Sequence, residues 1–413
     1  MGLLAQQFRT AVSKHKDYRM KDESTSSVAY STGFLNFDFM NGTVVHVKSE
    51  ERTFDYYSVG IQDGCLVMLI GRSGCGKTTW AVQTASNVIR DYPNACIFHD
   101  DIEGGLTEYR KELLSGFHGE ELATKYISRN TGITAENFYE RLRIIHDTKL
   151  ENRSDYEYDT GSFDSNGDRI YKLEPTVYIL DSLALLMPAQ YTEEEALSGS
   201  MSATAAAKVN SMSFKRIIPM LKSANIILLL INHINKKIEI NPMMHTKTQV
   251  SYLKQDETLP GGNTVIYLTN LLLRFDDNSK FKKDEAFGIS GNLVDITLVK
   301  SRNNRAGKSC TLVFDQDNGF DPELSLFVML KNAKRINGAG AYLYIGDRSD
   351  IKFSQKTFKE KLHESDELRK VFMDEVIKLL KEELDEQGNQ TTSSGFDYSL
   401  GKDIISMVNT SSV

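Results

Sequence analysis

Runs of consecutive apolar residues along the chain predict a set of short strands that are buried on both faces. The best defined lie at 66–70, 95–99, 175–181 and 225–231, and two more follow residue 263. Short unbroken apolar runs are typical of parallel strands covered by helices. Helical segments are expected between them, at 79–90, 107–143 and 205–224. This alternation predicts an α/β protein with a mainly parallel sheet and helices on both faces.

A glycine-rich segment joins the first strand to its helix and matches the pattern G-x-x-x-x-G-K-[ST]. Glycines let the backbone amides of such a loop turn toward phosphate oxygens at a helix N-terminus. The lysine of the pattern reaches the β- and γ-phosphates, and the hydroxyl residue holds Mg²⁺. The residues are Gly71, Arg72, Ser73, Gly74, Cys75, Gly76, Lys77 and Thr78, followed by Thr79. With a strand before it and a helix after it, this segment predicts binding of a nucleoside triphosphate with Mg²⁺.

Polar residues end three of the predicted strands, where functional groups collect in an open parallel sheet. Asp181 ends one strand and is expected to complete the Mg²⁺ site with Thr78. Glu103 follows another and could polarise the water that attacks the γ-phosphate, with Asp101 as the alternative acid. The same acids could instead form a turn that caps the next helix. His233 ends a third strand and either senses the γ-phosphate or only satisfies a hydrogen bond there.

Two polar segments, 188–204 and 234–260, are predicted to be loops. Long loops without secondary structure are uncommon in compact domains unless they are functional. The second loop contains four lysines and closes on a glycine pair: Lys236, Lys237, Lys247, Lys254, Gly261, Gly262 and Asn263. Lys300 and Arg302 end a later strand. Their cationic tip is either solvated or in contact with phosphate, within the subunit or across an interface.

The ends of the chain differ from its centre. Helical spacing in residues 2–20 predicts a helix that is either a plain packing element or an arm that docks on a neighbouring subunit. The apolar density falls from residue 331, a helix is expected at 372–384, and 388–413 is polar. We expect three parts: an N-terminal arm at 1–30, a nucleotide-binding core at 31–330 and a small C-terminal region at 331–413.

Two further segments are predicted to lie on the surface of the core. Residues 44–58 form an exposed excursion before the glycine-rich segment. Residues 155–168 are acidic and contain Asn166-Gly167, a hairpin signal. The ligand spacing and closing glutamate of an EF-hand are absent from this segment, so it is predicted to be a surface hairpin.

Composition adds a setting. The 413 residues are 40% hydrophobic and 25% charged, which is typical of a soluble globular protein. No apolar run is long enough to span a bilayer, and the N-terminus lacks a signal-peptide pattern. The four cysteines, Cys65, Cys75, Cys96 and Cys310, have no paired or zinc-type spacing, as expected of reduced thiols in the cytoplasm. The net charge of −7 argues little against nucleic acid, because residues 364–386 carry most of it.

Taken in order, these segments resemble RecA-type recombinases, most closely the UvsX-like bacteriophage branch. The matching stretches are STGFLNFD from residue 31, GRSGCGKTT from 71, CIFHDDIEGGLTEY from 96, VYILDSLALLMP from 177, LLLINH from 228, GGN from 261 and VKSRNNRAGK from 299. They span about residues 31–330. The glycine-rich motif alone is shared by many families, whereas the ordered set is far more specific.

The resemblance implies a RecA-like P-loop core and a role for each matching residue. Lys77, Thr78 and Asp181 would bind the phosphates and Mg²⁺, and Glu103 would be the catalytic carboxylate. Tyr109 would lie against the adenine, and His233 would report the γ-phosphate to the second DNA loop. Lys300 and Arg302 would reach the phosphates of the neighbouring subunit's ATP. Residues 189–203 and 234–260 would be the two DNA-binding loops.

The expected function is that of a Mg²⁺- and DNA-dependent ATPase that forms filaments on single-stranded DNA. It would promote homologous pairing and strand exchange with duplex DNA, in the cytoplasm (a host's, if viral) and without a membrane. One alternative is a DnaB-type hexameric helicase, which shares the core but closes into a ring. Others are a nucleotide-gated DNA-binding mediator with negligible hydrolysis and a P-loop ATPase that acts on proteins.

Overall fold

The computed structural model describes residues 27–48, 53–164, 167–191, 201–236, 250–254, 256–282 and 287–386. The predicted helix at 2–20 and the polar tail at 388–413 lie outside the described residues. So do most of the first predicted DNA loop and the middle of the second.

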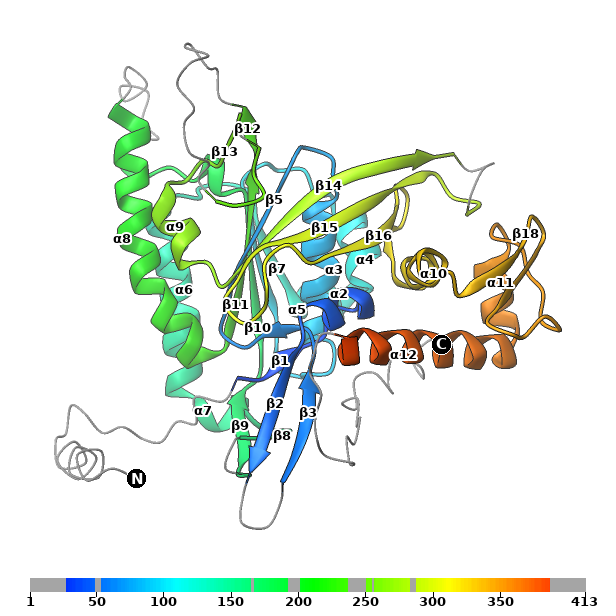
Figure 1. The fold of residues 1–413 in the computed structure, drawn as a ribbon. Coiled ribbons are helices and arrows are strands. Elements are labelled where there is room, and N and C mark those ends of the chain that lie inside the picture. The colour runs from blue at the N-terminus through cyan, green and yellow to red at the C-terminus, as the bar shows by residue number, and fades with distance from the viewer. Residues whose placement is uncertain are drawn as a thin grey trace.

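Nine strands of the described chain form one central sheet (Figure 1). Their order is β17-β16-β15-β14-β5-β11-β10-β6-β7, with parallel neighbours from β14 to β7 and antiparallel neighbours from β17 to β14. In that order the bounds are Gly319–Asp321, Ser309–Asp315, Gly291–Ser301, Leu271–Phe281, Leu66–Gly71, Ile226–His233, Thr176–Asp181, Ile97–Asp101 and Tyr126–Arg129. The chain is therefore a mixed α/β protein built on a mostly parallel sheet, as predicted.

Strand β5 shows why helices cover both faces of the sheet. Val67 and Leu69 belong to the same buried cluster as Trp80 of α3. Met68 belongs to a second buried cluster that contains Phe214 of α8. Because both faces of β5 are covered, its sequence shows no polar alternation. Figure 1 places α3 on one side of the central strands and α6, α8 and α9 on the other. These helices are α3 (Lys77–Ile89), α6 (Ala135–Glu151), α8 (Met201–Ala224) and α9 (Asn263–Leu268).

The remaining elements surround this core. On the N-terminal side they are β1 (Ala29–Tyr30), α2 (Leu35–Met40), β2 (Thr43–Lys48), β3 (Thr53–Ser58), β4 (Ile61–Gln62), α4 (Glu108–Ser115), α5 (Gly119–Lys125), α7 (Arg153–Tyr156), β8 (Glu157–Phe163) and β9 (Arg169–Leu173). Later in the chain they are η2 (Leu183–Leu185), η3 (Ala189–Tyr191), β12 (Asn235–Lys236), β13 (Glu257–Thr258), α10 (Pro322–Asn332), β18 (Ile336–Ala339), β19 (Tyr342–Ile345), α11 (Phe358–Glu364) and α12 (Asp366–Glu386). Hairpins β2–β3 and β8–β9 lie at one end of the sheet, and β12–β13 lies at the other (Figure 1).

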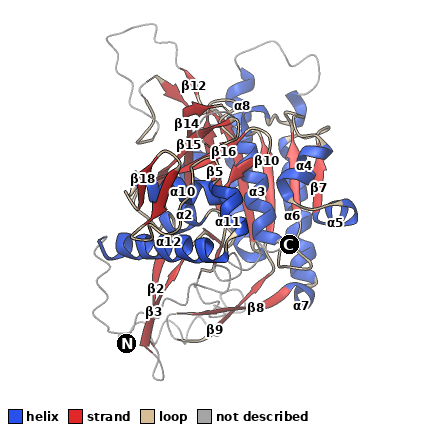
Figure 2. Cartoon of the chain, turned by 90° about the vertical axis from the view of Figure 1, so that its right-hand side faces the viewer, coloured by secondary structure: helices blue, strands red, loops and turns tan. Residues whose placement is uncertain are grey.

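The C-terminal region packs against the main body through a shared hydrophobic cluster. Phe353 and Phe358 pack against Phe327 of α10, Phe372 packs against Phe358, and the same buried cluster includes Leu35 of α2. Figure 2 shows α12 running beside α10 and α11. Low apolar density in the sequence after residue 331 thus conceals a packed aromatic centre. The helix expected at 372–384 begins earlier, at Asp366.

Several boundaries differ from the sequence predictions. Residues 107–143 contain, besides helices, the edge strand β7 (Tyr126–Arg129), which was not predicted. The excursion at 44–58 is the β2–β3 hairpin, and the predicted acidic hairpin is confirmed as β8–β9. Helix α8 begins at Met201, so the end of the loop expected at 188–204 is helical.

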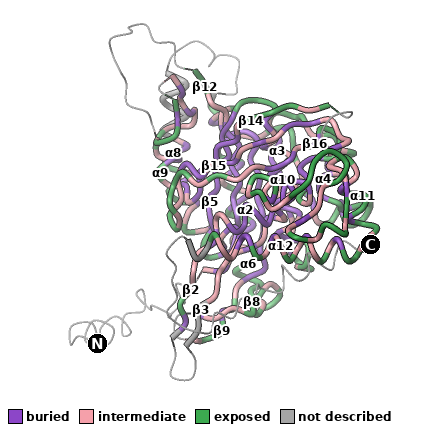
Figure 3. The backbone as a smooth tube through the Cα atoms, turned by 45° about the vertical axis from the view of Figure 1, so that its right-hand side comes forward, coloured by how far each residue is buried: buried purple, intermediate pink, exposed green. Residues whose placement is uncertain are grey.

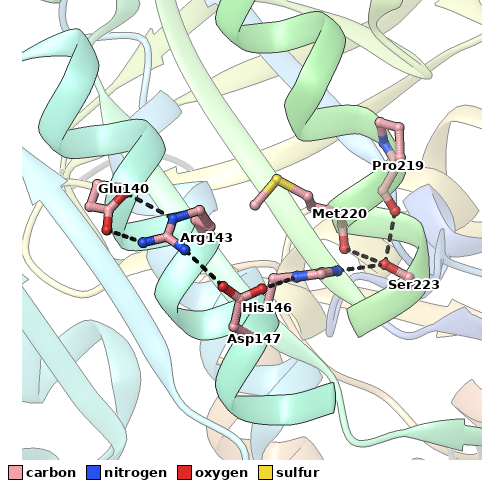
Figure 4. Close-up of polar contacts among 7 residues, drawn as sticks. All are labelled: Glu140, Arg143, His146, Asp147, Pro219, Met220 and Ser223. Carbon is pink, nitrogen blue, oxygen red and sulfur yellow. Dashed lines mark hydrogen bonds and ion pairs between the residues drawn. The ribbon is translucent and has the colours of Figure 1, made fainter. Parts of the chain in front are cut away.

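The outer helices α6 and α8 are joined by a surface network (Figure 4). The His146 ring bonds to the Asp147 carboxylate at 2.8 Å and to the Ser223 hydroxyl of α8 at 3.0 Å. Arg143 pairs with Asp147 at 3.1 Å and also with Glu140.

Buried residues are concentrated in the interior, along the central strands (Figure 3). Among the described residues, none of the helices combines the length and apolar character needed to cross a membrane.

Candidate nucleotide-binding site

The turn from β5 into α3 has the form that the glycine-rich motif predicts. Gly74 and Gly76 adopt left-handed backbone angles, with φ of 78° and 85°. A Cβ atom on Gly76 would lie 2.7 Å from Cζ of Phe320, so this position requires glycine for space as well as conformation. The Lys77 ammonium folds back over the turn and donates to the carbonyls of Gly71 at 3.1 Å and Arg72 at 2.7 Å.

Thr78 and Asp181 meet beside this turn. The Thr78 hydroxyl donates to Oδ2 of Asp181 at 2.6 Å, although the two residues are 103 positions apart. Asp181 ends β10 and is only 3% exposed. Burial, reinforced by the charges of Glu103 and Asp101, raises the pKa of Asp181 to about 6. A hydroxyl and a carboxylate are hard oxygen ligands, so this pair fits Mg²⁺ by the chemistry of its donors.

The two candidate acids, Asp101 at the end of β6 and Glu103 just after it, have different surroundings. The Asp101 carboxylate accepts backbone amides from Gly104 at 2.9 Å and Leu106 at 3.1 Å, and so closes the turn after the strand. Glu103 instead points into the pocket and accepts Nε2 of His233 at 2.6 Å. Burial would raise the pKa of Glu103, but the hydrogen bonds from His233 and Ser182, together with the charges of His233 and Lys77, outweigh burial and hold this pKa below its usual value. Glu103 is therefore the acid that faces the site.

His233 stands between the two halves of the site. It ends β11, the strand that separates β5 from β10, and its register partner on β5 is Gly71. The preceding Asn232 donates its side-chain amide to the Pro260 carbonyl at 2.9 Å, at the end of the second predicted loop. The strand end thus touches the pocket on one side and the loop on the other.

These groups line one open pocket of about 190 Å³. That volume is below the range that encloses a whole ligand of nucleotide size, so it suits a polyphosphate with the base outside. The sequence predicted most of its lining but missed Ile231 and Phe314. Phe314 comes from β16, far along the chain, and no local signal marks it. The lining residues are Ser73, Gly74, Gly76, Lys77, Thr78, Thr79, Glu103, Asp181, Ile231, His233 and Phe314.

Tyr109 lies outside this pocket, near the start of α4. Its ring is 73% exposed, which leaves it available to a planar group. The helix is capped by the Thr107 hydroxyl, which accepts the Arg110 amide at 3.3 Å. The Arg110 guanidinium bonds to the carbonyls of Gln316 and Asp317 and fixes the β16–β17 turn beside α4. Sequence reasoning missed Arg110.

Lys300 and Arg302 do not line the pocket of their own chain. Lys300 donates to the carbonyls of Ile266 at 2.9 Å and Tyr267 at 2.7 Å, and Arg302 donates to the Leu268 carbonyl at 3.2 Å. Both cations therefore cap the C-terminal end of α9, where carbonyls lack helical partners. Contact with the ATP of a neighbouring subunit stays a prediction.

The anchors of the second predicted loop are described, whereas Lys237 and Lys247 lie outside the described residues. Lys236 and Lys254 are exposed. Arg274 of β14 forms a buried bidentate pair with Glu257, at 2.6 and 3.1 Å, and also bonds to the Tyr252 carbonyl. This pair ties the returning end of the loop to the sheet.

The predicted closing segment, Gly261, Gly262 and Asn263, leads into α9. Gly261 has φ of 93°, and a Cβ atom there would lie 2.7 Å from Leu183, which follows Asp181 and Ser182. The loop end is therefore in close contact with the segment that follows β10.

No protein-family model matches the chain, and no curated protein matches it either.

Proposed function

We propose that this chain is an ATP-dependent DNA recombinase of the RecA type, which assembles on single-stranded DNA and promotes homologous pairing and strand exchange. The observation that carries the proposal is the convergence of Lys77, Thr78, Asp181, Glu103 and His233 on one pocket at the carboxyl ends of parallel strands. Local sequence alone predicts a functional role for each of these residues.

The pocket supports hydrolysis of a phosphoanhydride. Glu103 would orient a water whose oxygen attacks the γ-phosphorus, and its carboxylate would accept the proton as the bond to the ADP oxygen breaks. The backbone amides of the turn and Lys77 hold the phosphates in line. Mg²⁺ held at Thr78 and Asp181 would offset charge on the β- and γ-phosphates. The exposed Tyr109 would cover the base.

The link to DNA is supported by the path from His233 to the second loop. Glu103 bonds to His233, Asn232 bonds to Pro260, and the loop between carries Lys236 and Lys254 at its exposed ends. A γ-phosphate that displaces Glu103 would therefore change the position of the loop through two hydrogen bonds, Glu103 to His233 and Asn232 to Pro260. Lysines of this loop would attract the DNA backbone, and binding would weaken with salt.

Assembly is supported by the open pocket and by the cations at α9. An open pocket of this kind suits a nucleotide shared between subunits, with Lys300 and Arg302 supplied by the neighbour. A head-to-tail contact of this kind produces an open filament or, if the rotation closes, a ring.

The test is steady-state ATP hydrolysis with and without single-stranded DNA over a salt series. We expect strong stimulation by DNA that fades as salt rises. A rate indifferent to DNA would refute the recombinase and leave a P-loop ATPase that acts on another partner. Electron micrographs and strand-exchange assays then separate a filament that exchanges strands from a closed ring that unwinds them. DNA binding with negligible turnover would instead indicate a mediator.

A further inference from the structure

Three side chains that can ligate a metal converge behind the nucleotide pocket. His99 and Asp101 lie two residues apart on β6 and so point to the same face of the sheet. Asp181 on the neighbouring strand β10 is the register partner of Asp101. One ligand atom from each of the three residues lies within 4.8 Å of the others. All three are buried, with exposures of 1%, 5% and 3%.

The His99 ring is oriented as a ligand would be. Its Nδ1 bonds to the Tyr126 hydroxyl of β7 at 2.8 Å. Its Nε2 is buried and has no hydrogen-bond partner. When Nδ1–H donates to the tyrosine oxygen, Nε2 carries the lone pair. A histidine that ligates a metal is held in this way by a hydrogen bond at its other nitrogen.

The carboxylates beside it lack a balancing cation. Asp101 accepts backbone amides, and Asp181 uses Oδ2 for Thr78 while Oδ1 is buried with no hydrogen-bond partner. Among the described residues, neither aspartate forms an ion pair. The charges of Lys77 and Lys111 act on this cluster, but their ammonium groups bond elsewhere: Lys77 to two carbonyls, and Lys111 to Glu108 and Ser128. An imidazole lone pair and two carboxylates in one dry volume repel one another unless a cation lies between them.

We propose that His99, Asp101 and Asp181 bind one divalent transition-metal ion, with zinc as the best match, at a site that shares Asp181 with the proposed Mg²⁺ site at Thr78. One nitrogen and two carboxylate ligands suit zinc, which is held by three protein ligands in sites that keep a fourth position open. Imidazole favours such ions over magnesium, which prefers oxygen ligands alone. Asp181 also lines the nucleotide pocket, which gives the ion a path inward. The site needs no nucleotide and does not rest on the proposed function.

The experiment uses the full chain without a histidine tag, stripped of metal by a chelator and kept free of nucleotide. Co²⁺ serves as a spectroscopic probe, and Zn²⁺ competes with it. We expect one ion per chain, with a visible absorption band that Zn²⁺ abolishes. His99→Phe is expected to weaken binding by at least about 100-fold. Tyr126→Phe keeps all three ligands and is expected to weaken it by about 10- to 100-fold through loss of ring orientation.

Two controls separate this site from others. His146→Phe removes an imidazole that also lies beside an aspartate, but on the surface of α6, and is expected to leave Co²⁺ binding unchanged (Figure 4). Lys77→Ala is expected to keep Co²⁺ binding while it removes the proposed ATP turnover, so the two proposals fail separately. Binding well below one ion per chain would overturn the proposal. So would equal affinity in the wild type and in folded Tyr126→Phe and His99→Phe variants, as judged by circular dichroism.

Discussion

Each end of the parallel strands has a buried aspartate, and the two aspartates have opposite electrostatic surroundings. At the amino end, Asp63 precedes β5, accepts the Ser27 hydroxyl at 2.7 Å and the Val28 amide at 3.0 Å, and pairs with Lys172 at 2.9 Å and Lys222 at 3.6 Å. Burial alone would raise the pKa of Asp63, but the two lysines outweigh it and this pKa is lowered. The charge is thus matched by opposite charge.

At the carboxyl end, Asp181 has one hydroxyl donor and two acids nearby. Its pKa is raised to about 6 by burial and by Glu103 and Asp101. Like charges gathered in a dry site reduce stability unless a ligand brings positive charge. The amino end of the sheet thus balances its buried charge within the fold, whereas the carboxyl end gathers negative charge that a bound cation would balance.

Removal of Lys77 tests the binding end most severely. The proposed function predicts that Lys77→Ala lowers ATP turnover by at least about 10³-fold, because the only side-chain cation that lines the described pocket is lost. Phosphate release under saturating DNA measures it. Lys215→Ala, an exposed change on α8, is the matched control and should keep the wild-type rate. Appreciable hydrolysis by Lys77→Ala would refute the site.

Substitutions of Asp101, at the end of β6, and of Glu103, just after it, are expected to have different effects in the same assay. Glu103→Gln keeps an acceptor for His233 but removes the proton acceptor, so turnover should fall by about 10²- to 10³-fold with nucleotide binding retained. Asp101→Asn should mainly loosen the turn that its carboxylate closes, seen as a lower melting temperature. Loss of turnover in Asp101→Asn alone, with unchanged stability, would reverse the assignment.

The sequence was sufficient to predict features that depend on residues adjacent in the chain. The apolar runs of β5, β10 and β11 predicted a sheet covered on both faces. Because Asp181 and His233 end two of these runs, they were expected at the same edge of the sheet. The turn glycines and the hairpin at 157–173 were equally local, since Gly76 and Gly167 have backbone angles that other residues rarely adopt.

Features set by register between distant segments could not be predicted. Nothing near Phe314 indicates that β16 brings it to the pocket. Likewise, the sequence around His99 does not reveal that Asp181 lies opposite Asp101, two residues further along the same strand. Strand β7 has only four residues and follows a helix directly, so no periodicity marks it. The charges of Lys300 and Arg302 predicted either a solvated tip or a phosphate contact, and they did not reveal that within the chain both cations bond to the carbonyls at the end of α9.

The amino end should show a large effect on stability and none on chemistry. Asp63→Ala is expected to lower the free energy of unfolding by about 2–4 kcal/mol, because it leaves the Ser27 and Val28 donors and Lys172 without their buried partner. Urea denaturation monitored by circular dichroism measures it. Asp147→Ala removes a comparable ion pair on the surface of α6 and should cost less than about 1 kcal/mol. Equal losses in the two variants would mean that burial of Asp63 contributes nothing.

The carboxyl end should show the opposite sign, in nucleotide-free protein with a chelator present. Asp181→Asn is expected to raise the free energy of unfolding at pH 7 by about 1–3 kcal/mol, because the ionised carboxylate is disfavoured there. The pKa of Asp181 is about 6 in the folded chain against a usual 3.8, so the folded state binds the extra proton. Wild type therefore gains stability relative to Asp181→Asn as the pH falls from about 7 to about 4. For Asp63, whose pKa is lowered, the contribution is instead lost as the pH falls below the usual aspartate value. If the stability difference between wild type and Asp181→Asn did not change with pH, ionised Asp181 would not destabilise the folded chain, and the contrast with Asp63 would fail.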